Sequence, residues 1–211
     1  MNDLPTTDVR TNAYTACVTP ETIPCVASVM QKLLPNESYD PDFKGQAIET
    51  YYFDTVNFDL RAARIKKDKY CTVRIRYYRA NGTYALSAKT ESGKFRKEIP
   101  EQQAKWYLQN ALDWNAFPAD IQARLLELIG SFELVPVVCV EFTRYAVEDD
   151  TNRLTLDIGT KTNTGKVFPS VAILENKTTA DPPEPMEAIK ALGLPPIKLS
   201  KFLWSTTYGV R

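Results

Sequence analysis

Basic side chains that could hold phosphate groups are concentrated in three short runs near the middle of the chain. In each run they alternate with apolar or small residues, which is the two-residue period of a strand with one apolar face. An Asn-Gly pair and a Ser-Gly pair separate the runs and can form tight turns. If the runs form a three-stranded meander, one face presents Arg74, Arg76, Lys89, Lys94 and Arg96. Arginine offers a planar fork to phosphate oxygens and lysine adds a point charge, so this face is suited to a polyanion.

These cations could instead line the solvated face of an ordinary antiparallel sheet, as many charges do. Their single sign argues against that alternative. From Arg61 to Lys97 there are 12 cations against two anions, Asp68 and Glu91, in a chain of zero net charge. Because like charges on adjacent strands repel each other, such a cluster indicates a bound anion. A nucleic acid is disfavoured as that anion, since the chain as a whole is not basic.

The composition excludes several classes of chemistry. Histidine is absent, which removes Ser-His and Cys-His nucleophiles and imidazole general bases. The four cysteines are scattered without a Cys-x-x-Cys pair, so a zinc site is disfavoured and oxygen ligands would favour Mg²⁺ or Mn²⁺. Scattered cysteines in a chain that starts without a signal peptide indicate reduced thiols and a cytoplasmic protein. No apolar run is long enough to cross a bilayer, although a membrane partner is compatible with the sequence.

The residue patterns predict one domain over 1–211, because no repeat or convincing linker divides the chain. Besides the three meander runs, strands are expected at 10–19, 47–53, 137–147, 153–158 and 171–178. Helices are expected at 20–34, 57–64, 101–112, 118–129 and 186–192, with Thr19 as the N-cap and Pro20 as the first helical residue of the first one. In the segments 101–112 and 118–129, apolar residues at three- and four-residue spacing predict that these two helices pack outside the sheet.

Seven short motifs that contain charged residues follow one another along the chain, and their order is more specific than any one of them. They are Arg-Ile-Arg, Ala-Lys-Thr, Lys-Phe-Arg-Lys, Glu-Phe-Thr-Arg-Tyr, Asn-Arg-Leu-Thr-Leu-Asp, Ile-Leu-Glu-Asn-Lys and Leu-Ser-Lys-Phe. Over roughly residues 45–205 this series resembles the polyphosphate-polymerase (VTC) domain, a branch of the triphosphate tunnel metalloenzymes that also include the CYTH phosphatases and cyclases. The resemblance implies an α+β fold in which eight antiparallel strands close into a tunnel, with helices packed outside.

The resemblance also implies roles for individual residues. Basic side chains inside the tunnel would hold a triphosphate or growing polyphosphate, and a carboxylate, Glu175, would bind Mn²⁺ or Mg²⁺. Lys89, Lys94 and Lys201 are the candidate catalytic residues. The candidate substrate-binding residues are Arg74, Arg76, Lys89, Lys94, Arg96, Arg144, Arg153, Lys177, Ser200 and Lys201.

The chain departs from the family pattern in its first strand. Residues 10–14 contain no carboxylate and no lysine where the family carries a Glu-x-Lys element, and Ser87 stands where a glutamate is common. Glu175 is therefore nearly alone as an inward-facing carboxylate. We expect Asp157 to bond within a turn and Glu141 to point outward. These departures leave open whether the protein is an enzyme.

Other roles remain open for several of the candidates. Glu175 could form an ion pair with a tunnel cation instead of binding a metal. Ser200 and Lys201 could form a solvated helix end. Tyr78 and Phe142 are interpreted as packing residues rather than nucleotide contacts.

Two main hypotheses for function follow. The first is metal-dependent phosphoryl transfer on a triphosphate, with polyphosphate synthesis from ATP as the leading form and inorganic triphosphate hydrolysis as a variant. The second is a non-catalytic module that binds triphosphate or polyphosphate. Phosphoryl transfer needs positioning and charge neutralisation more than covalent help from the protein, which fits a histidine-free basic site.

Overall fold

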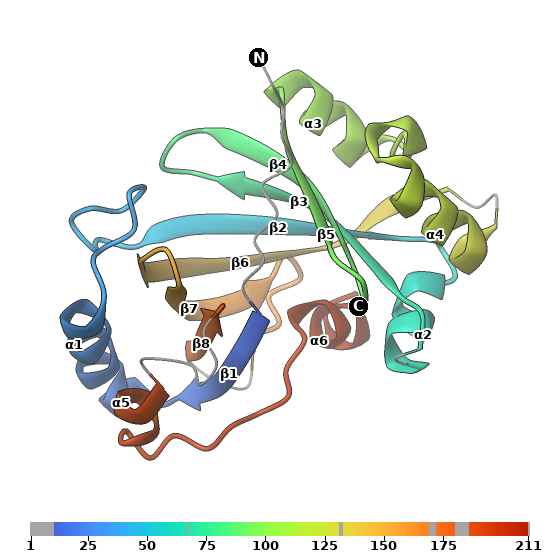
Figure 1. Ribbon diagram of the computed structural model, residues 1–211. Coiled ribbons are helices and arrows are strands. Elements are labelled where there is room, and N and C mark those ends of the chain that lie inside the picture. Colours follow the sequence, from blue (N-terminus) through green and yellow to red (C-terminus); the bar gives the residue numbers. More distant parts are fainter. Residues whose placement is uncertain (1–10, 67, 131–132, 169–171, 180–185, 211) are drawn as a thin grey trace.

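The structure, a computed structural model, describes residues 11–66, 68–130, 133–168, 172–179 and 186–210 (Figure 1). Its strands are β1 (Thr11–Val18), β2 (Gln46–Asp54), β3 (Cys71–Tyr78), β4 (Thr83–Thr90), β5 (Lys94–Ile99), β6 (Val135–Glu148), β7 (Asn152–Thr162) and β8 (Ala172–Thr178). Its helices are α1 (Ile23–Leu33), α2 (Asp59–Lys66), α3 (Glu101–Gln109), α4 (Ala119–Ile129), α5 (Met186–Lys190) and α6 (Lys201–Tyr208). The fold is α+β, as expected.

All eight strands belong to one antiparallel sheet, whose order is β1-β8-β7-β6-β2-β3-β4-β5. In the described part of the chain, no hydrogen-bonded pairing joins the two edge strands, β1 and β5. The predicted eight-stranded antiparallel sheet is therefore confirmed, whereas its closure into a complete tunnel is not.

Helices cover the apolar face of the sheet, as the spacing of their apolar residues predicts. On one half, Val73 and Ile75 of β3 are buried in a cluster that includes Leu125 of α4. On the other half, Leu156 of β7 is buried against Met30 of α1. The apolar residues of the alternating strands thus face the helices, as predicted.

Helix α6 differs from that expectation, because it packs on the opposite, charged face. The ring of Phe202 lies 5.3 Å from the ring of Tyr52, and Tyr52 pairs in register with Arg74 of the basic meander. Residues directly opposite each other in a sheet share a face, so α6 covers part of the face that carries the cations. Helix α6 packs beside β6 and α2 (Figure 1).

Several element boundaries shift from the predicted ones. A 3₁₀ turn over Pro20–Thr22 leads directly into α1, and Thr19 and Pro20 are its N-cap and first residue, as predicted. The Thr19 side chain makes no capping hydrogen bond to the backbone of this turn. Strand β7 extends to Thr162, beyond the expected end, and Gly130 does follow α4 with a positive φ of 60°. The four cysteines are free thiols, as predicted. No helix in the described residues is long and apolar enough to cross a membrane.

Gly45, just before β2, supports a testable prediction about packing. It has φ +84°, and a Cβ added there would lie 2.7 Å from both the Tyr145 ring and Thr143 Cγ2. We expect Gly45→Ala to lower the free energy of unfolding by about 2–4 kcal/mol, from overpacking and a left-handed backbone together. Gly165→Ala is the control, because Gly165 has φ +81° but an added Cβ would meet nothing within 4 Å. Equal losses for the two variants, measured by urea unfolding, would contradict the steric explanation.

Candidate functional site

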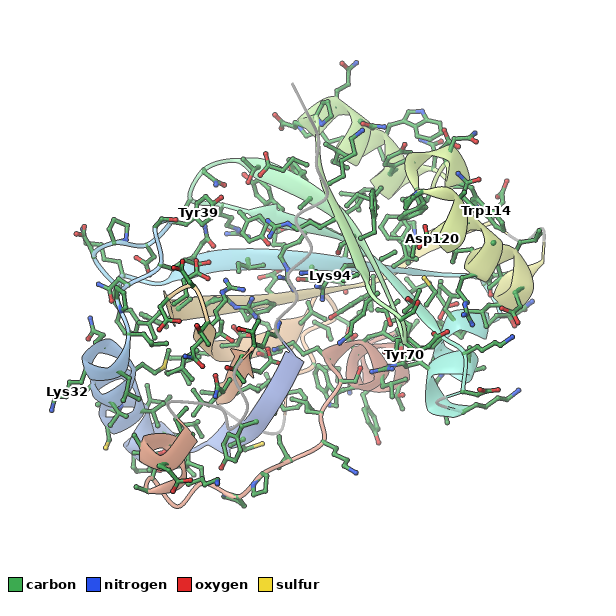
Figure 2. The ribbon with its side chains drawn as sticks, viewed as in Figure 1. Lys32, Tyr39, Tyr70, Lys94, Trp114 and Asp120 are labelled. Atoms are coloured by element: carbon green, nitrogen blue, oxygen red, sulfur yellow. The ribbon has the colours of Figure 1, made fainter. Side chains whose placement is uncertain are left out.

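The cations of the meander lie on one face of the sheet, as predicted. Arg74 is opposite Ser87 in register, and Ser87 is opposite Arg96. Lys94 is opposite Lys89 across the β4–β5 turn. We call this side of the sheet the cationic face. Its charged residues include Arg74, Arg76, Lys89, Lys94, Arg96, Glu98, Arg144, Glu148, Arg153, Asp157, Glu175 and Lys177, together with Lys201 of α6. In Figure 2, Lys94 lies near the middle of the molecule, whereas Lys32 of α1 projects from its periphery.

Charges on distant strands of the cationic face act on one another. Lys89 on β4 and Glu175 on β8 are five strands apart in the sheet order, about 24 Å if the sheet were flat. Desolvation and the charge of Arg74 lower the pKa of Lys89, and the charge of Glu175 acts in the opposite direction. Burial likewise lowers the pKa of Lys177 on β8 to about 8, and Arg74 on β3 contributes to that shift. The sheet therefore curls so that its two halves face each other across the cations.

Asp157 is at the centre of the tightest charge cluster on this face. Its side chain is 1% exposed and accepts hydrogen bonds from Arg144 Nε at 2.6 Å and Arg144 Nη2 at 2.7 Å. Lys201 Nζ donates to Asp157 Oδ2 at 2.6 Å from the first residue of α6. Burial alone would raise the pKa of Asp157, but the charges of Arg144 and Lys201 hold it well below its usual range. The expectation that Asp157 bonds within a turn is wrong, because Asp157 lies inside β7 and faces the cations.

Ser200 and Lys201 are placed by the start of α6. The Ser200 hydroxyl accepts a hydrogen bond from Leu203 N at 3.3 Å, so Ser200 is the N-cap of the helix. Capping aims the next side chain, Lys201, at Asp157, and only 12% of the Lys201 side chain is exposed. Lys201 is therefore no solvated helix end, while Ser200 has a capping role in addition to the predicted contact with substrate.

Arg153 is less available to a ligand than the sequence suggests. Its Nη2 donates to Glu37 Oε1 at 2.6 Å, and its Nε lies 3.4 Å from Glu148 Oε2. The carboxylates of Glu37 and Glu148 thus offset the charge of Arg153 at the start of β7. Arg74 and Arg76 differ from it, because their Nε atoms donate to neutral hydroxyls, Ser87 Oγ at 3.1 Å and Thr50 Oγ1 at 3.2 Å.

Four cations converge on a small polar pocket of the cationic face. It is lined by Arg74, Arg76, Tyr78, Ala85, Ser87, Lys94 and Arg96. Burial lowers the pKa of Arg74 to about 10, and the neighbouring charge of Arg76 adds to this shift. A buried cation that costs stability in this way is offset when an anion binds beside it. Four of the ten predicted substrate-binding residues therefore meet at one place.

Phe142 lies among cations that come from three different elements. Its ring centroid is 5.1 Å from Lys201 Nζ, 5.3 Å from Arg144 Cζ and 6.0 Å from Arg76 Cζ. The negative face of an aromatic ring attracts cations at such distances. Phe142 is buried, so its interpretation as a packing residue holds, but its packing partners include the charged groups of the site.

Glu175 is the carboxylate of this face that a metal ion could use. It lies on β8 between Thr15 of β1 and Thr155 of β7 in register. Burial alone would raise its pKa, and the charges of Lys201 and Lys177 lower it, so the carboxylate stays ionised. The Thr155 hydroxyl is buried and has no hydrogen-bond partner in the described part of the chain. Asp157 is occupied by Arg144 and Lys201, and Glu141 points outward to Lys161, as predicted.

The Glu175 carboxylate and the Thr155 hydroxyl fit an Mg²⁺ or Mn²⁺ ion that binds together with the phosphate oxygens of a substrate. They fit less well an ion that the protein would hold by itself. No cluster of three or more acidic or cysteine side chains occurs among the described residues. Mg²⁺ is typically bound through one or two carboxylates plus substrate phosphates and water. Glu175 would supply that carboxylate, and the ion when bound would neutralise charge on phosphoryl oxygens.

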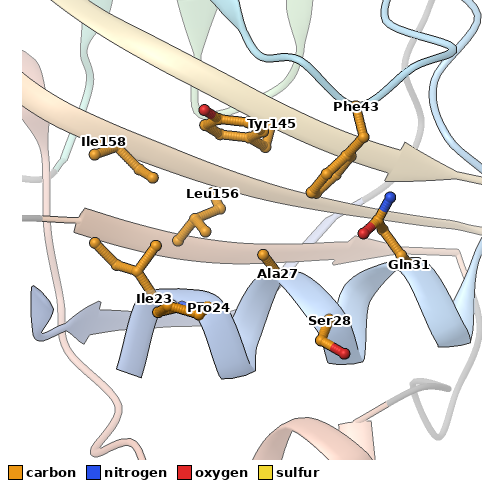
Figure 3. Close-up of a pocket in the computed structure, with 9 residues that line it drawn as sticks. All are labelled: Ile23, Pro24, Ala27, Ser28, Gln31, Phe43, Tyr145, Leu156 and Ile158. Carbon is orange, nitrogen blue, oxygen red and sulfur yellow. The ribbon is translucent and has the colours of Figure 1, made fainter. Parts of the chain in front are cut away.

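A second pocket, of about 300 Å³, lies on the apolar face of the sheet and is separate from the cations (Figure 3). Its walls are α1, the loop at Phe43 and the outward residues Tyr145, Leu156 and Ile158. The flanking residues Arg144 and Asp157 point to the other side of the sheet. None of the described residues that line it is charged, so this lining does not suit phosphate.

Sequence reasoning missed the central role of Asp157, although a signal existed. Arg144 and Asp157 alternate with outward-facing neighbours on two strands joined by a short acidic turn, and hairpin pairing places them opposite each other. The role of Lys201 in that cluster had no comparable signal, because 44 residues separate it from Asp157.

Comparison with protein families matches the VTC domain over residues 10–208. The chain therefore belongs to the VTC domain family. Comparison with curated proteins gives no match.

Solved structures share the fold at low sequence identity. A candidate adenylate cyclase from Bacillus halodurans is 17% identical with a TM-score of 0.63, over 90% of this chain and 93% of that one. A candidate adenylyl cyclase from Hippeastrum, described as having a dominant triphosphatase activity, is 18% identical with a TM-score of 0.57, over 95% and 96% of the two chains. A candidate adenylate cyclase from Vibrio parahaemolyticus is 12% identical with a TM-score of 0.55, over 92% and 95%.

Proposed function

We propose that this protein binds a triphosphate or polyphosphate chain along its cationic face and transfers a phosphoryl group with the help of Mn²⁺ or Mg²⁺. The leading form of this reaction is polyphosphate synthesis from ATP. The observation that carries the proposal is the convergence of Arg74, Arg76, Lys94 and Arg96 on one pocket, with Lys177 facing them from the other half of the sheet. Membership of the VTC domain family and the triphosphatase described for the Hippeastrum protein support it.

Each group has a role in this proposal. The arginine guanidinium groups of β3 and β5 bind phosphoryl oxygens and hold the phosphate chain in position for in-line transfer. Lys89, Lys94 and Lys201 add positive charge where negative charge develops on the transferred and leaving phosphates. Glu175 orients the metal ion, and the ion pair of Asp157 with Arg144 and Lys201 fixes the positions of those two cations.

A second candidate, a non-catalytic binding module, is favoured by one observation. Strand β1 pairs with β8 beside Glu175 but contributes no carboxylate or lysine to the sheet. Incubation with ATP and Mn²⁺, followed by analysis of the products, separates the possibilities. Long chains indicate the polymerase, and free phosphate or pyrophosphate without chains indicates a hydrolase. Tight, salt-sensitive binding of tripolyphosphate without any product indicates the binding module.

Arg74→Ala tests the anion site itself. We expect it to weaken tripolyphosphate binding by about 10–100-fold, because charge-assisted hydrogen bonds contribute roughly 1.5–3 kcal/mol each. Its melting temperature should stay close to the wild-type value, since no carboxylate of the described residues forms an ion pair with Arg74 and an unpaired buried cation adds little stability. Titration calorimetry measures the affinity. The control is Lys105→Ala, which removes one positive charge from an exposed side chain of α3. If both variants bind as tightly as the wild type, the anion does not bind on the cationic face.

A further inference from the structure

Tyr78 lines the polar pocket but has no role in the proposed reaction. It is the last residue of β3, and its neighbours in the pocket lining are Arg74, Arg76, Lys94 and Arg96. The Arg96 guanidinium lies 5.3 Å from the centroid of the Tyr78 ring. A phenol among four cations is an unusual choice for packing, because its hydroxyl is the one neutral donor with a titratable proton in that pocket.

The groups that face Tyr78 are almost all cationic. Strand β3 contributes Arg74 and Arg76, β5 contributes Lys94 and Arg96, and the charge of Arg144 on β6 also reaches the phenol. Strand β4 contributes the uncharged Ala85 and Ser87 to the same lining, and β2 places Ile48 opposite Tyr78 in register. Glu98 of β5 lies opposite Ala85 on this face and is outside that lining. An anion that enters the pocket therefore meets the Tyr78 hydroxyl together with these cations.

We propose that Tyr78 is a phosphate-binding residue that couples anion binding to a proton, its hydroxyl donating to a phosphoryl oxygen in the pocket. The inference rests on the proposed function and adds a condition to it, which is that Tyr78 must be protonated when the anion is bound. The phenolate would place a negative charge in the pocket and would compete with the phosphate for the same guanidinium groups.

The electrostatics of the free protein make this coupling measurable near neutral pH. Burial alone would raise the pKa of Tyr78, but Arg76 and Arg96, with a hydrogen bond from Arg76, lower it to about 8. A bound polyanion offsets the charge of these cations and therefore raises the pKa of Tyr78 again. By linkage, the affinity for the anion then falls as pH rises above the pKa of the free phenol, by up to about ten-fold for each pH unit.

The first test follows tyrosinate absorbance of the wild-type protein between pH 6.5 and 10. One tyrosine is expected to titrate near pH 8, and saturating tripolyphosphate is expected to move that titration upward by a pH unit or more. Tyr51 and Tyr84 do not interfere, because burial raises the pKa of both. A titration that tripolyphosphate leaves in place would overturn the inference, and this measurement needs no variant.

The second test compares tripolyphosphate affinity of the wild type and Tyr78→Phe across the same pH range by calorimetry. The ratio of wild-type to variant affinity is expected to be highest at pH 6.5 and to fall at least several-fold by pH 9.5. Titration of the ligand and of Lys177 cancels in that ratio. Tyr84→Phe, which alters the ring stacked on Tyr77 instead, is the matched control and should follow the wild type. A ratio that is constant with pH would overturn the role of Tyr78 alone, whereas no binding by either protein at any pH would overturn the proposed function as well.

Discussion

Asp157→Asn is expected to lower the free energy of unfolding by about 3–5 kcal/mol, the cost of breaking a buried ion pair from one side. The change keeps the size of the side chain but leaves Arg144 and Lys201 without their shared carboxylate. Arg144 is 6% exposed, so water cannot replace the lost partner. Thermal or urea unfolding followed by circular dichroism measures the loss.

The control for this variant is Glu101→Gln, which breaks an exposed pair with Lys105 on α3. Exposed pairs contribute about 0–1 kcal/mol, so this change should be nearly neutral. A loss of less than about 1 kcal/mol for Asp157→Asn would contradict the assignment of Asp157 as the central acceptor of the cluster.

The same residue predicts a dependence of stability on pH. The pKa of Asp157 is lower in the folded protein than in the unfolded chain, where it is about 3.9. Its stabilisation is therefore complete above the unfolded value and is lost progressively as pH falls below that value towards the lower pKa of the folded protein. The melting temperature of the wild type should drop more steeply than that of Asp157→Asn between about pH 5 and pH 3. Parallel curves for the two proteins would show that Asp157 is not held ionised by its partners.

Glu175→Gln is expected to lower metal-dependent turnover by at least about 100-fold, since even residues outside the metal ligands cost 10–100-fold when removed. The variant keeps the shape of the side chain but removes the carboxylate that would bind the ion. Anion binding should stay equal or become tighter, because one negative charge leaves a cationic surface. The measurements are product formation from ATP and Mn²⁺, and tripolyphosphate affinity without metal.

Glu141→Gln is the control, because Glu141 lies on the opposite face of β6 beside Lys161. It should leave turnover and affinity unchanged. Full turnover by Glu175→Gln would show that Glu175 does not bind the metal ion. A large loss of anion binding without metal would instead indicate that Glu175 acts by holding Lys177 and Lys201 in place.

Much of the fold could be predicted because it depends on the local alternation of apolar and charged residues along each strand. Val73 and Ile75 alternate with Arg74 and Arg76, and this period fixes both the strand and the side that each residue faces. The order of charged motifs then identified the family. Closure of the sheet could not be predicted in this way, because it depends on contacts between β1 and β5, which lie at opposite ends of the sheet order.

The site was predicted less completely, because charge pairing depends on long-range contacts. Arg153 and Arg74 look equivalent in sequence, yet Glu37 and Glu148 offset the charge of Arg153, whereas Arg74 donates to the neutral hydroxyl of Ser87. Glu37 is 116 residues from Arg153, and no local pattern indicates such a pair. Tyr78 was interpreted as a packing residue for the same reason, since its charged surroundings form only when β3, β4 and β5 pair.

A crystal structure with bound tripolyphosphate is the measurement that tests the central claim most directly. We predict phosphoryl groups within hydrogen-bond distance of the Arg74 and Arg76 guanidinium groups, with the chain running toward Lys177 on the facing half of the sheet. Electron density for the ligand on the outer, helix-covered side of the sheet, or a cationic face that stays empty at saturating ligand, would contradict the account.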